Sequence, residues 1–251
     1  WKGNGYQGFF AMATGTGKTI TALNCLLDIF QTEGRYRCII VVPTISLVDQ
    51  WVREVRKFHF VNIVKISSKE RNWKDDISRL TASACFDRNS SFVVISTYAS
   101  LAKKEVLGWL EDLPDDTLVI ADEAHNLGSP LLINAIQRLP FKRRLGLSAT
   151  PKRQFDKVGN EAITRYFNVF SGYTFEYSMK LAIENGVLCH YLYYPHIVQL
   201  NEYEMEEYSV LSRKIGKFYD PDTDSFKDSP ILTALLIKRK RIIHKASAKI
   251  V

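Results

Sequence analysis

Short apolar runs alternate with amphipathic stretches through the first 150 residues. The apolar runs predict buried strands, and the stretches between them have the periodicity of helices. The first helix is marked by Ile20, Leu23, Leu27 and Phe30, which fall on one helical face. The expected strands are residues 9–13, 38–42, 62–66, 92–97, 117–121 and 144–147, and the expected helices are residues 20–30, 48–55, 73–80, 98–110 and 131–139.

This alternation predicts an α/β fold with a mostly parallel sheet, right-handed crossovers and helices on both faces. Ligands of such sheets gather at the carboxyl ends of the strands. The polar motifs described below each follow the end of an expected strand. We therefore expect them to form a single site.

Beyond Pro151 the regular alternation ends, and Tyr and Phe become frequent. A short capped helix is expected at 178–185, an extended strand at 191–200, and a helix capped by Asn201. A turn-rich loop at 219–230 and a helix at 231–251 follow. Two domains are predicted. Residues 1–165 form the α/β domain, and residues 166–251 form a helical and extended connector.

Composition narrows the class of protein. The chain has 251 residues, a net charge of +7 and 46% hydrophobic residues, values that permit a globular core and favour a polyanionic partner. No apolar run approaches the roughly 20 residues that cross a bilayer. The four cysteines are scattered, as expected of reduced thiols in a cytoplasmic protein. The chain begins at Trp1 without a methionine, which suggests a piece of a longer protein.

The segment between the first strand and the first helix has the composition of a phosphate-binding loop. Gly15 and Gly17 allow backbone angles that let successive N–H groups surround phosphate oxygens. Lys18 is expected to reach the β- and γ-phosphates, and the Thr19 hydroxyl to hold Mg²⁺. Met12 stands where the strict pattern has glycine, and Gly-Lys-Thr also occurs in ordinary turns. The predicted nucleotide-binding residues are Thr14, Gly15, Thr16, Gly17, Lys18 and Thr19.

Two adjacent acids, Asp122 and Glu123, end another apolar strand. Asp122 is expected to contact the Mg²⁺ held by Thr19, and Glu123 to deprotonate an attacking water. A pair of solvated acids closing a strand is the alternative. His125 follows the pair, and Ser148 and Thr150 end the next strand. These three side chains are expected to connect the state of the nucleotide with the rest of the molecule, although small hydroxyl residues are also common before a proline turn.

Taken together, the motifs resemble those of superfamily 2 helicases and translocases. Residues 13–19, 122–125 and 148–150 resemble motifs I, II and III, and residues 43–44 and 96–98 resemble motifs Ia and Ib. In that superfamily the first glycine of the phosphate loop is commonly replaced. The resemblance is closest to type I and type III restriction-enzyme motor subunits and DNA-repair helicases, through residues 42–51, 95–98, 182–188 and 238–241.

The resemblance implies a RecA-like P-loop NTPase domain that hydrolyses ATP with Mg²⁺ to move on DNA, mostly duplex DNA. Its catalytic residues are then Lys18, Asp122 and Glu123. A second RecA-like domain of the same longer chain is expected to complete the ATP site, so this fragment should hydrolyse ATP poorly alone. Nuclease or methylase subunits are candidate partners, in restriction, phage defence or repair.

Contacts to nucleic acid rest on fewer residues. Thr44 and Thr97, each at a strand end beside a helix start, are expected to bind backbone phosphates, with ordinary helix capping as the alternative. One stripe of the last predicted helix is basic and consists of Lys238, Arg241, Lys245 and Lys249. We favour a solvated helix face over a DNA-binding site as the interpretation of this stripe.

Three other functions remain open from the sequence. The chain fits a nucleotide-gated ATPase that acts as an adaptor in a multi-subunit complex. It also fits an RNA-directed helicase, because phosphate-contacting residues do not distinguish the sugars. A P-loop kinase or transferase is a third alternative, against which residues 122–125 and 148–150 argue.

Overall fold

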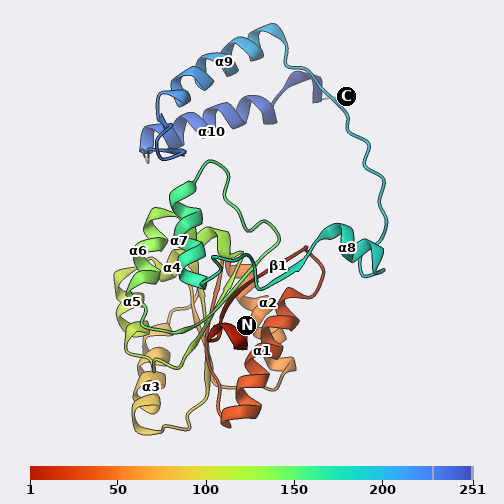
Figure 1. Cartoon of the computed structure of the whole chain (residues 1–251). Helices are drawn as coiled ribbons and strands as arrows, with labels where there is room; N and C mark the ends of the chain where they lie inside the picture. The colour runs from red at the N-terminus through yellow and green to blue at the C-terminus, as the bar shows by residue number, and fades with distance from the viewer. Residues whose placement is uncertain (228, 250–251) are drawn as a thin grey trace. The chain divides into compact units, whose positions relative to one another are not determined.

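The computed structural model describes residues 1–227 and 229–249 and divides into two compact units (Figure 1). The first comprises Trp1–Arg153 and Gly159–Cys189, and the second Gln154–Val158 and His190–Val251. The functional domain boundary expected between residues 165 and 166 stays a prediction.

The first unit is built on a parallel sheet of seven strands in the order β3-β4-β2-β5-β6-β1-β7. The expected parallel α/β fold is thereby confirmed. The strands are β1 (Gln7–Met12), β2 (Arg37–Val42), β3 (Ile63–Ile66), β4 (Phe92–Thr97), β5 (Leu118–Asp122), β6 (Arg143–Ser148) and β7 (Phe175–Tyr177). Strand β7 was not predicted, because its three residues are largely exposed and carry no apolar run.

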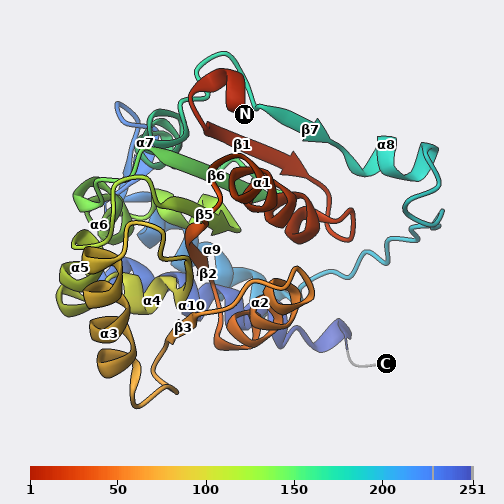
Figure 2. The same ribbon diagram turned by 90° about the horizontal axis from the view of Figure 1, so that it is seen from below.

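Helices cover both faces of this sheet, as Figure 2 shows, with α1 and α2 on one face and α3 to α6 on the other. The α-helices up to residue 189 are α1 (Lys18–Glu33), α2 (Ile45–Lys57), α3 (Trp73–Phe86), α4 (Tyr98–Leu101), α5 (Lys104–Glu111), α6 (Pro130–Arg138), α7 (Lys157–Phe167) and α8 (Met179–Glu184). Short 3-10 helices lie at Lys2–Asn4 and Ala124–Gly128. The single helix expected at 98–110 is divided into α4 and α5.

Two apolar clusters lie on opposite faces of the sheet, because successive side chains of a strand point to opposite sides. In β2, Ile39 and Val41 belong to one cluster, and Cys38, Ile40 and Val42 to the other. All six residues of this strand are buried, as expected of a central parallel strand covered on both faces. The sheet therefore forms a rigid support for the loops at its carboxyl edge.

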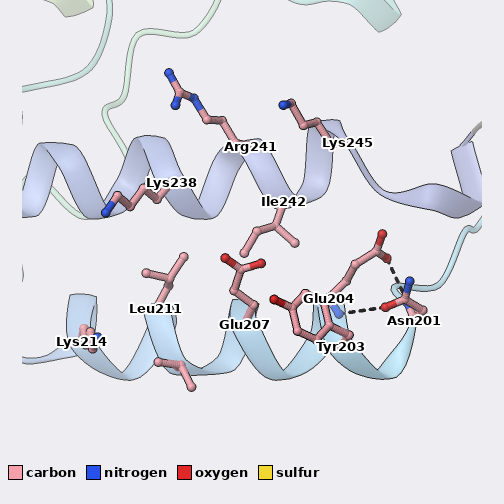
Figure 3. A pocket seen from close by; sticks show the side chains of 11 residues that line it. Asn201, Tyr203, Glu204, Glu207, Leu211, Lys214, Lys238, Arg241, Ile242 and Lys245 are labelled. Carbon is pink, nitrogen blue, oxygen red and sulfur yellow. Dashed lines mark hydrogen bonds between the residues drawn. The ribbon is translucent and has the colours of Figure 1, made fainter.

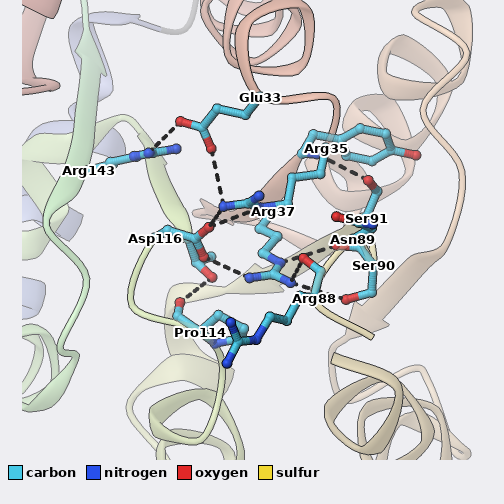
Figure 4. A network of polar contacts seen from close by, with 12 residues as sticks. Glu33, Arg35, Arg37, Arg88, Asn89, Ser90, Ser91, Pro114, Asp116 and Arg143 are labelled. Atoms are coloured by element: carbon cyan, nitrogen blue, oxygen red, sulfur yellow. Dashed lines mark hydrogen bonds and ion pairs between the residues drawn. The ribbon is translucent and has the colours of Figure 1, made fainter. Parts of the chain in front are cut away.

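The opposite edge, where β2, β5 and β6 begin, is held by a network of charges (Figure 4). Asp116 accepts hydrogen bonds from Arg35 at 2.9 Å and from Arg37 at 3.0 Å. Glu33 pairs with Arg143 at 2.6 Å. Burial alone would raise the pKa of Asp116, but the hydrogen bonds from both arginines outweigh it and lower this pKa. This network ties strand starts together, far from the carboxyl edge.

The second unit is a helical hairpin. It contains α9 (Glu202–Gly216), the short strands β8 (Tyr219–Asp220) and β9 (Ser225–Phe226), α10 (Pro230–His244) and a 3-10 turn (Ser247–Lys249). Asn201 caps α9 as predicted, in a reciprocal pair with Glu204. Residues 191–200, expected as a strand, are assigned to neither helix nor strand. The helix predicted to reach residue 251 ends at His244, and residues 250 and 251 lie outside the described part.

Candidate functional site

The predicted phosphate loop joins β1 to α1 at the carboxyl edge of the sheet. Gly15 has a φ of 83° and Gly17 a φ of 89°, values that residues with a side chain rarely adopt. Gly17 is the N-cap of α1, and no side chain makes a capping hydrogen bond there. The first backbone N–H groups of α1 are therefore open to an anion, at the positive end of the helix dipole.

Lys18 and Thr16 fold back onto the carbonyls of this loop. Lys18 Nζ donates to the carbonyl oxygens of Met12 at 3.3 Å and Ala13 at 3.4 Å, and Thr16 Oγ1 donates to that of Ala13 at 2.7 Å. The two lysine bonds lie beyond the usual range of a strong charged hydrogen bond. The ammonium can exchange them for phosphate oxygens at little cost. Thr14 is exposed and Thr19 is half-buried beside them.

The register of the sheet brings the distant motifs to the same edge. Strand β6 lies between β1 and β5, with Ser148 beside Ala11 and Leu147 beside Asp122. The ends of β1, β5 and β6 are therefore level, and the polar residues that follow them emerge together. Burial raises the carboxyl pKa of Asp122, and the positive charge of Lys18 opposes part of this rise. The predicted phosphate loop and the predicted acids thus share one edge of the sheet.

Asp122 is held in place by hydrogen bonds to both carboxylate oxygens. Its Oδ2 accepts from Trp51 Nε1 at 3.0 Å, and its Oδ1 accepts from the backbone N–H of Glu123 at 3.0 Å. The residue is only 8% exposed, and this burial raises its pKa above the ordinary value. The hydrogen bond from Trp51 opposes that rise. A buried, oriented carboxylate is the kind of oxygen ligand that Mg²⁺ takes in nucleotide sites.

Glu123, His125 and Thr150 meet at a single buried hydroxyl, that of Ser148. Ser148 Oγ donates to Glu123 Oε2 at 3.1 Å, accepts from Thr150 N–H at 3.0 Å and lies 2.9 Å from His125 Nδ1. A hydroxyl has one proton. When that proton is donated to Glu123, His125 Nδ1 is the donor to Ser148 Oγ, and in the other tautomer Nδ1 accepts the hydroxyl proton. The three coupling residues predicted from the sequence therefore form one network with the predicted general base.

The backbone of Glu123 is also unusual, because its φ of 48° lies in the left-handed region. A non-glycine residue in this conformation is uncommon and is often found at functional sites. Here it directs the carboxylate towards β6, to Ser148. The side chain remains 31% exposed, so a water molecule has access to it.

Two residues of the site had no predicted role at the nucleotide. Trp51 was expected in a helix and in the segment 42–51 that resembles restriction motors, and Tyr98 at a helix start and in the segment that resembles motif Ib. The Tyr98 hydroxyl donates to the backbone carbonyl of Asp122 at 2.7 Å, and burial raises its pKa well above the ordinary value. A signal existed in the sequence, since a buried indole N–H or phenol O–H requires a partner. The sequence did not identify that partner.

The structure separates the two threonines that were expected to bind nucleic acid. Thr44 is an exposed N-cap of α2, and its hydroxyl accepts from Leu47 N–H at 3.4 Å. Thr97 is the N-cap of α4 but only 4% exposed, and its hydroxyl is engaged by the backbone N–H and hydroxyl of Ser100. For Thr97 the alternative of ordinary capping is favoured. A phosphate contact by Thr44 stays a proposal.

A groove of about 700 Å³ lies between α9 and α10 in the second unit (Figure 3). Lys238, Arg241 and Lys245 of the basic stripe line it, but Glu204 and Glu207 of α9 line it too. Ile242 points towards α9 in its floor. The mixture of basic and acidic side chains agrees with a solvated helix face. The sequence favoured this interpretation of the basic stripe over a DNA site.

The residues at the sheet edge fit a nucleotide with its Mg²⁺. The open N–H groups of α1 and the Lys18 ammonium suit the phosphates, and Thr19 and Asp122 offer the oxygen atoms that Mg²⁺ prefers. Among the described residues, no helix is both long and apolar enough to cross a membrane.

Comparison with known proteins adds an independent line of support. The family "Type III restriction enzyme, res subunit" matches residues 2–153. The chain is 30% identical over 151 residues to the "DNA 3'-5' translocase XPB2" of Sulfurisphaera tokodaii, a match that covers 60% of this chain and 28% of the relative. It is 28% identical over 159 residues to "Putative helicase 22" of a Sulfolobus islandicus filamentous virus, covering 60% of this chain and 25% of the relative. The chain thus spans about a quarter of the length of these relatives.

Solved structures show the same fold. The DNA-bound type ISP restriction-modification enzyme LlaBIII superposes with a TM-score of 0.56 at 21% identity, covering 74% of this chain and 15% of that one. The helicase domain of Pyrococcus furiosus Hef gives a TM-score of 0.55 at 17% identity, covering 98% of this chain and 51% of that one. Because the family model matches more than half of the chain, the chain belongs to the family of the type III restriction enzyme res subunit, and its seven-stranded unit is the first RecA-like lobe of a superfamily 2 helicase or translocase.

Proposed function

We propose that this chain is the nucleotide-binding lobe of an ATP-dependent translocase that acts on duplex DNA. The observation that carries the proposal is the meeting of the phosphate loop with Asp122 and Glu123 at one sheet edge. The identity to a DNA translocase supports DNA as the track. Restriction, phage defence or repair is the proposed setting, with nuclease or methylase subunits as candidate partners.

Each residue of the edge has a role in the proposed hydrolysis. Lys18 and the N–H groups of α1 bind the phosphates, and Thr19 and Asp122 hold Mg²⁺. The metal, when bound, neutralises charge that develops on the transferred phosphoryl group. Glu123 orients a water and takes its proton, so that the water oxygen bonds to the γ-phosphorus. The bond to the β–γ bridging oxygen then breaks, and ADP and phosphate result.

The network at Ser148 is proposed to report this reaction. Ser148 contacts the carboxylate of Glu123, the ring of His125 and the backbone of Thr150 at once. A change in the charge or position of Glu123 therefore alters two neighbouring chain segments. Thr44, exposed at the start of α2 on the carboxyl edge of β2, is the proposed contact to a backbone phosphate.

The test is hydrolysis of ATP by the intact protein with duplex DNA, single-stranded DNA or RNA, together with displacement of a triplex strand. Duplex DNA is expected to stimulate turnover most and to support displacement. Stimulation without displacement would favour a nucleotide-gated adaptor, and stimulation by RNA alone would favour an RNA helicase. A phosphorylated acceptor among the products would instead indicate a kinase or transferase.

Two substitutions test the residue roles in the same assay. Lys18→Ala is expected to abolish nucleotide binding and turnover, whereas Glu123→Gln should bind ATP and hydrolyse it at least about a hundredfold more slowly. Lys57→Ala, which removes an exposed lysine of α2, is the matched control and should behave as the unmodified protein. Unchanged turnover in Lys18→Ala would refute the proposed mechanism.

A further inference from the structure

Strand β1, which leads into the predicted phosphate loop, has its outer edge covered by β7, a strand that follows residues 148–150 in the chain. Strand β7 pairs in parallel with β1, with Phe175 beside Phe10 and Tyr177 beside Met12 (Figure 2). The pairing extends into the phosphate loop, because Ala13 N–H donates to the carbonyl of Tyr177 at 2.9 Å. The backbone at the start of the loop is therefore bonded to the end of β7.

The chain beyond β7 turns back towards the same loop. Helix α8 is capped by Ser178 and ends before Gly186, whose φ of 70° allows the reversal. The backbone N–H groups of Val187 and Leu188 both donate to the carbonyl of Ala182, at 2.9 and 3.0 Å, and Ala182 is fully buried. These bonds fix the position of Leu188.

Leu188 is placed against the tip of the phosphate loop. A Cβ atom built on Gly15 would lie 3.3 Å from Leu188 Cδ2, whereas one built on Gly17 would meet nothing within 4 Å. The contact therefore involves the tip at Gly15 and leaves the start of α1 open. The next residue, Cys189, is the last of the first compact unit.

We propose that Leu188 is a positioning residue for the nucleotide, which holds the tip of the phosphate loop and links nucleotide binding to the order of residues 177–189. Gly15 has wide conformational freedom, and a neighbour that restricts it lowers the entropy lost when phosphate binds. Linkage is reciprocal, so bound nucleotide must in turn stabilise the position of Leu188. The inference rests on the proposed function, because it requires a nucleotide at this loop.

The first test compares nucleotide affinity in the intact protein. Leu188→Ala is expected to raise the dissociation constant of Mg·ATPγS about three- to tenfold, because the freed loop must be ordered on binding. Leu188→Met, which keeps most of the contact, should restore the affinity. Val187→Ala removes a neighbouring side chain that is 51% exposed and serves as the matched control. Equal affinities for Leu188→Ala and Val187→Ala, with both proteins folded by circular dichroism, would overturn the proposal.

The second test measures whether bound nucleotide orders the segment that contains Leu188. Cys189 and Cys85 are both exposed, and Cys85 lies on α3. Saturating Mg·ATPγS should slow alkylation of Cys189 by iodoacetamide severalfold in the unmodified protein and leave Cys85 unchanged, as measured by peptide mass spectrometry. In Leu188→Ala the slowing should be lost, although nucleotide still saturates the site. An unchanged Cys189 rate in the unmodified, nucleotide-saturated protein would refute the linkage. Absence of nucleotide binding altogether would instead refute the proposed function.

Discussion

The indole N–H of Trp51 donates a 3.0 Å hydrogen bond to Oδ2 of Asp122, and so connects α2 with the end of β5. Trp51 is 1% exposed and belongs to the apolar cluster beneath α1 and α2. One side chain therefore packs the core with its rings and orients a proposed metal ligand with its nitrogen. Because Thr44 is the N-cap of α2, the same helix connects the proposed DNA contact with the proposed ATP site.

Replacing Trp51 by Phe keeps most of the packing and removes this hydrogen bond. ATP turnover at neutral pH should fall about tenfold, as is typical when the partner of a metal-binding carboxylate is lost. Burial already raises the pKa of Asp122, and the Trp51 bond lowers it, so the pKa should rise further in the variant. Since the proposed metal ligand is the ionised form, the acidic limb of the kcat/KM profile should move to higher pH. An acidic limb at the same pH in both proteins would contradict this role.

The hydroxyl of Ser148 is predicted to couple hydrolysis to movement. Ser148→Ala leaves Thr150 N–H without its acceptor and should cost about 1 kcal/mol of unfolding free energy. ATP should still bind, but the number of triplex displacements per ATP hydrolysed should fall severalfold, because Glu123 and His125 lose their shared partner. Ser129→Ala is the matched control, since the Ser129 hydroxyl makes no capping hydrogen bond to α6. Equal coupling ratios in the two variants would argue against this network.

The network at Asp116 predicts a pH dependence of stability. Because the folded-state pKa of Asp116 is lowered, its contribution is present above the ordinary aspartate pKa and is lost as pH falls through the folded value. Asp116→Asn should therefore cost about 2 kcal/mol near neutral pH, where Arg35 and Arg37 lose a charged partner. The difference from the unmodified protein should shrink in increasingly acidic urea titrations. A difference that stays constant down to the lowest pH would show that charge is not its cause.

Two glycines provide a paired test of packing. A Cβ at Gly146 would lie 2.5 Å from Phe9 Cδ2 and close to Phe167, both fully buried, so Gly146→Ala should destabilise the fold by about 2 kcal/mol. Gly108 lies within α5 with nothing within 4 Å of its Cβ position. Gly108→Ala should instead stabilise the protein by about 0.5–1 kcal/mol, through helix propensity. Urea denaturation of both variants measures the difference, and equal effects would contradict the packing argument.

The sequence predicted the parallel sheet and the glycine-rich turn between β1 and α1, because residues close together in the chain specify both. Phosphate binding by that turn stays a prediction. Uninterrupted apolar runs such as residues 38–42 can be satisfied only by a strand buried on both faces. The glycines before Lys18 set the loop conformation locally. The placement of Asp122 at a strand end followed from the same pattern, and parallel strands bring such ends to one edge.

Only the tertiary structure determined which side chains contact the predicted site residues. Helical periodicity places Trp51 on the buried face of α2 but does not say that its N–H meets Asp122, 71 residues away. Packing between distant segments likewise buries Thr97 and adds β7 to the sheet. It also places Leu188 against Gly15. The sequence alone determined the fold class and the predicted nucleotide-binding residues, because local backbone preference and hydrophobic pattern specify them. The three-dimensional packing determined which side chains orient those residues, because such contacts follow from shape and register rather than from spacing along the chain.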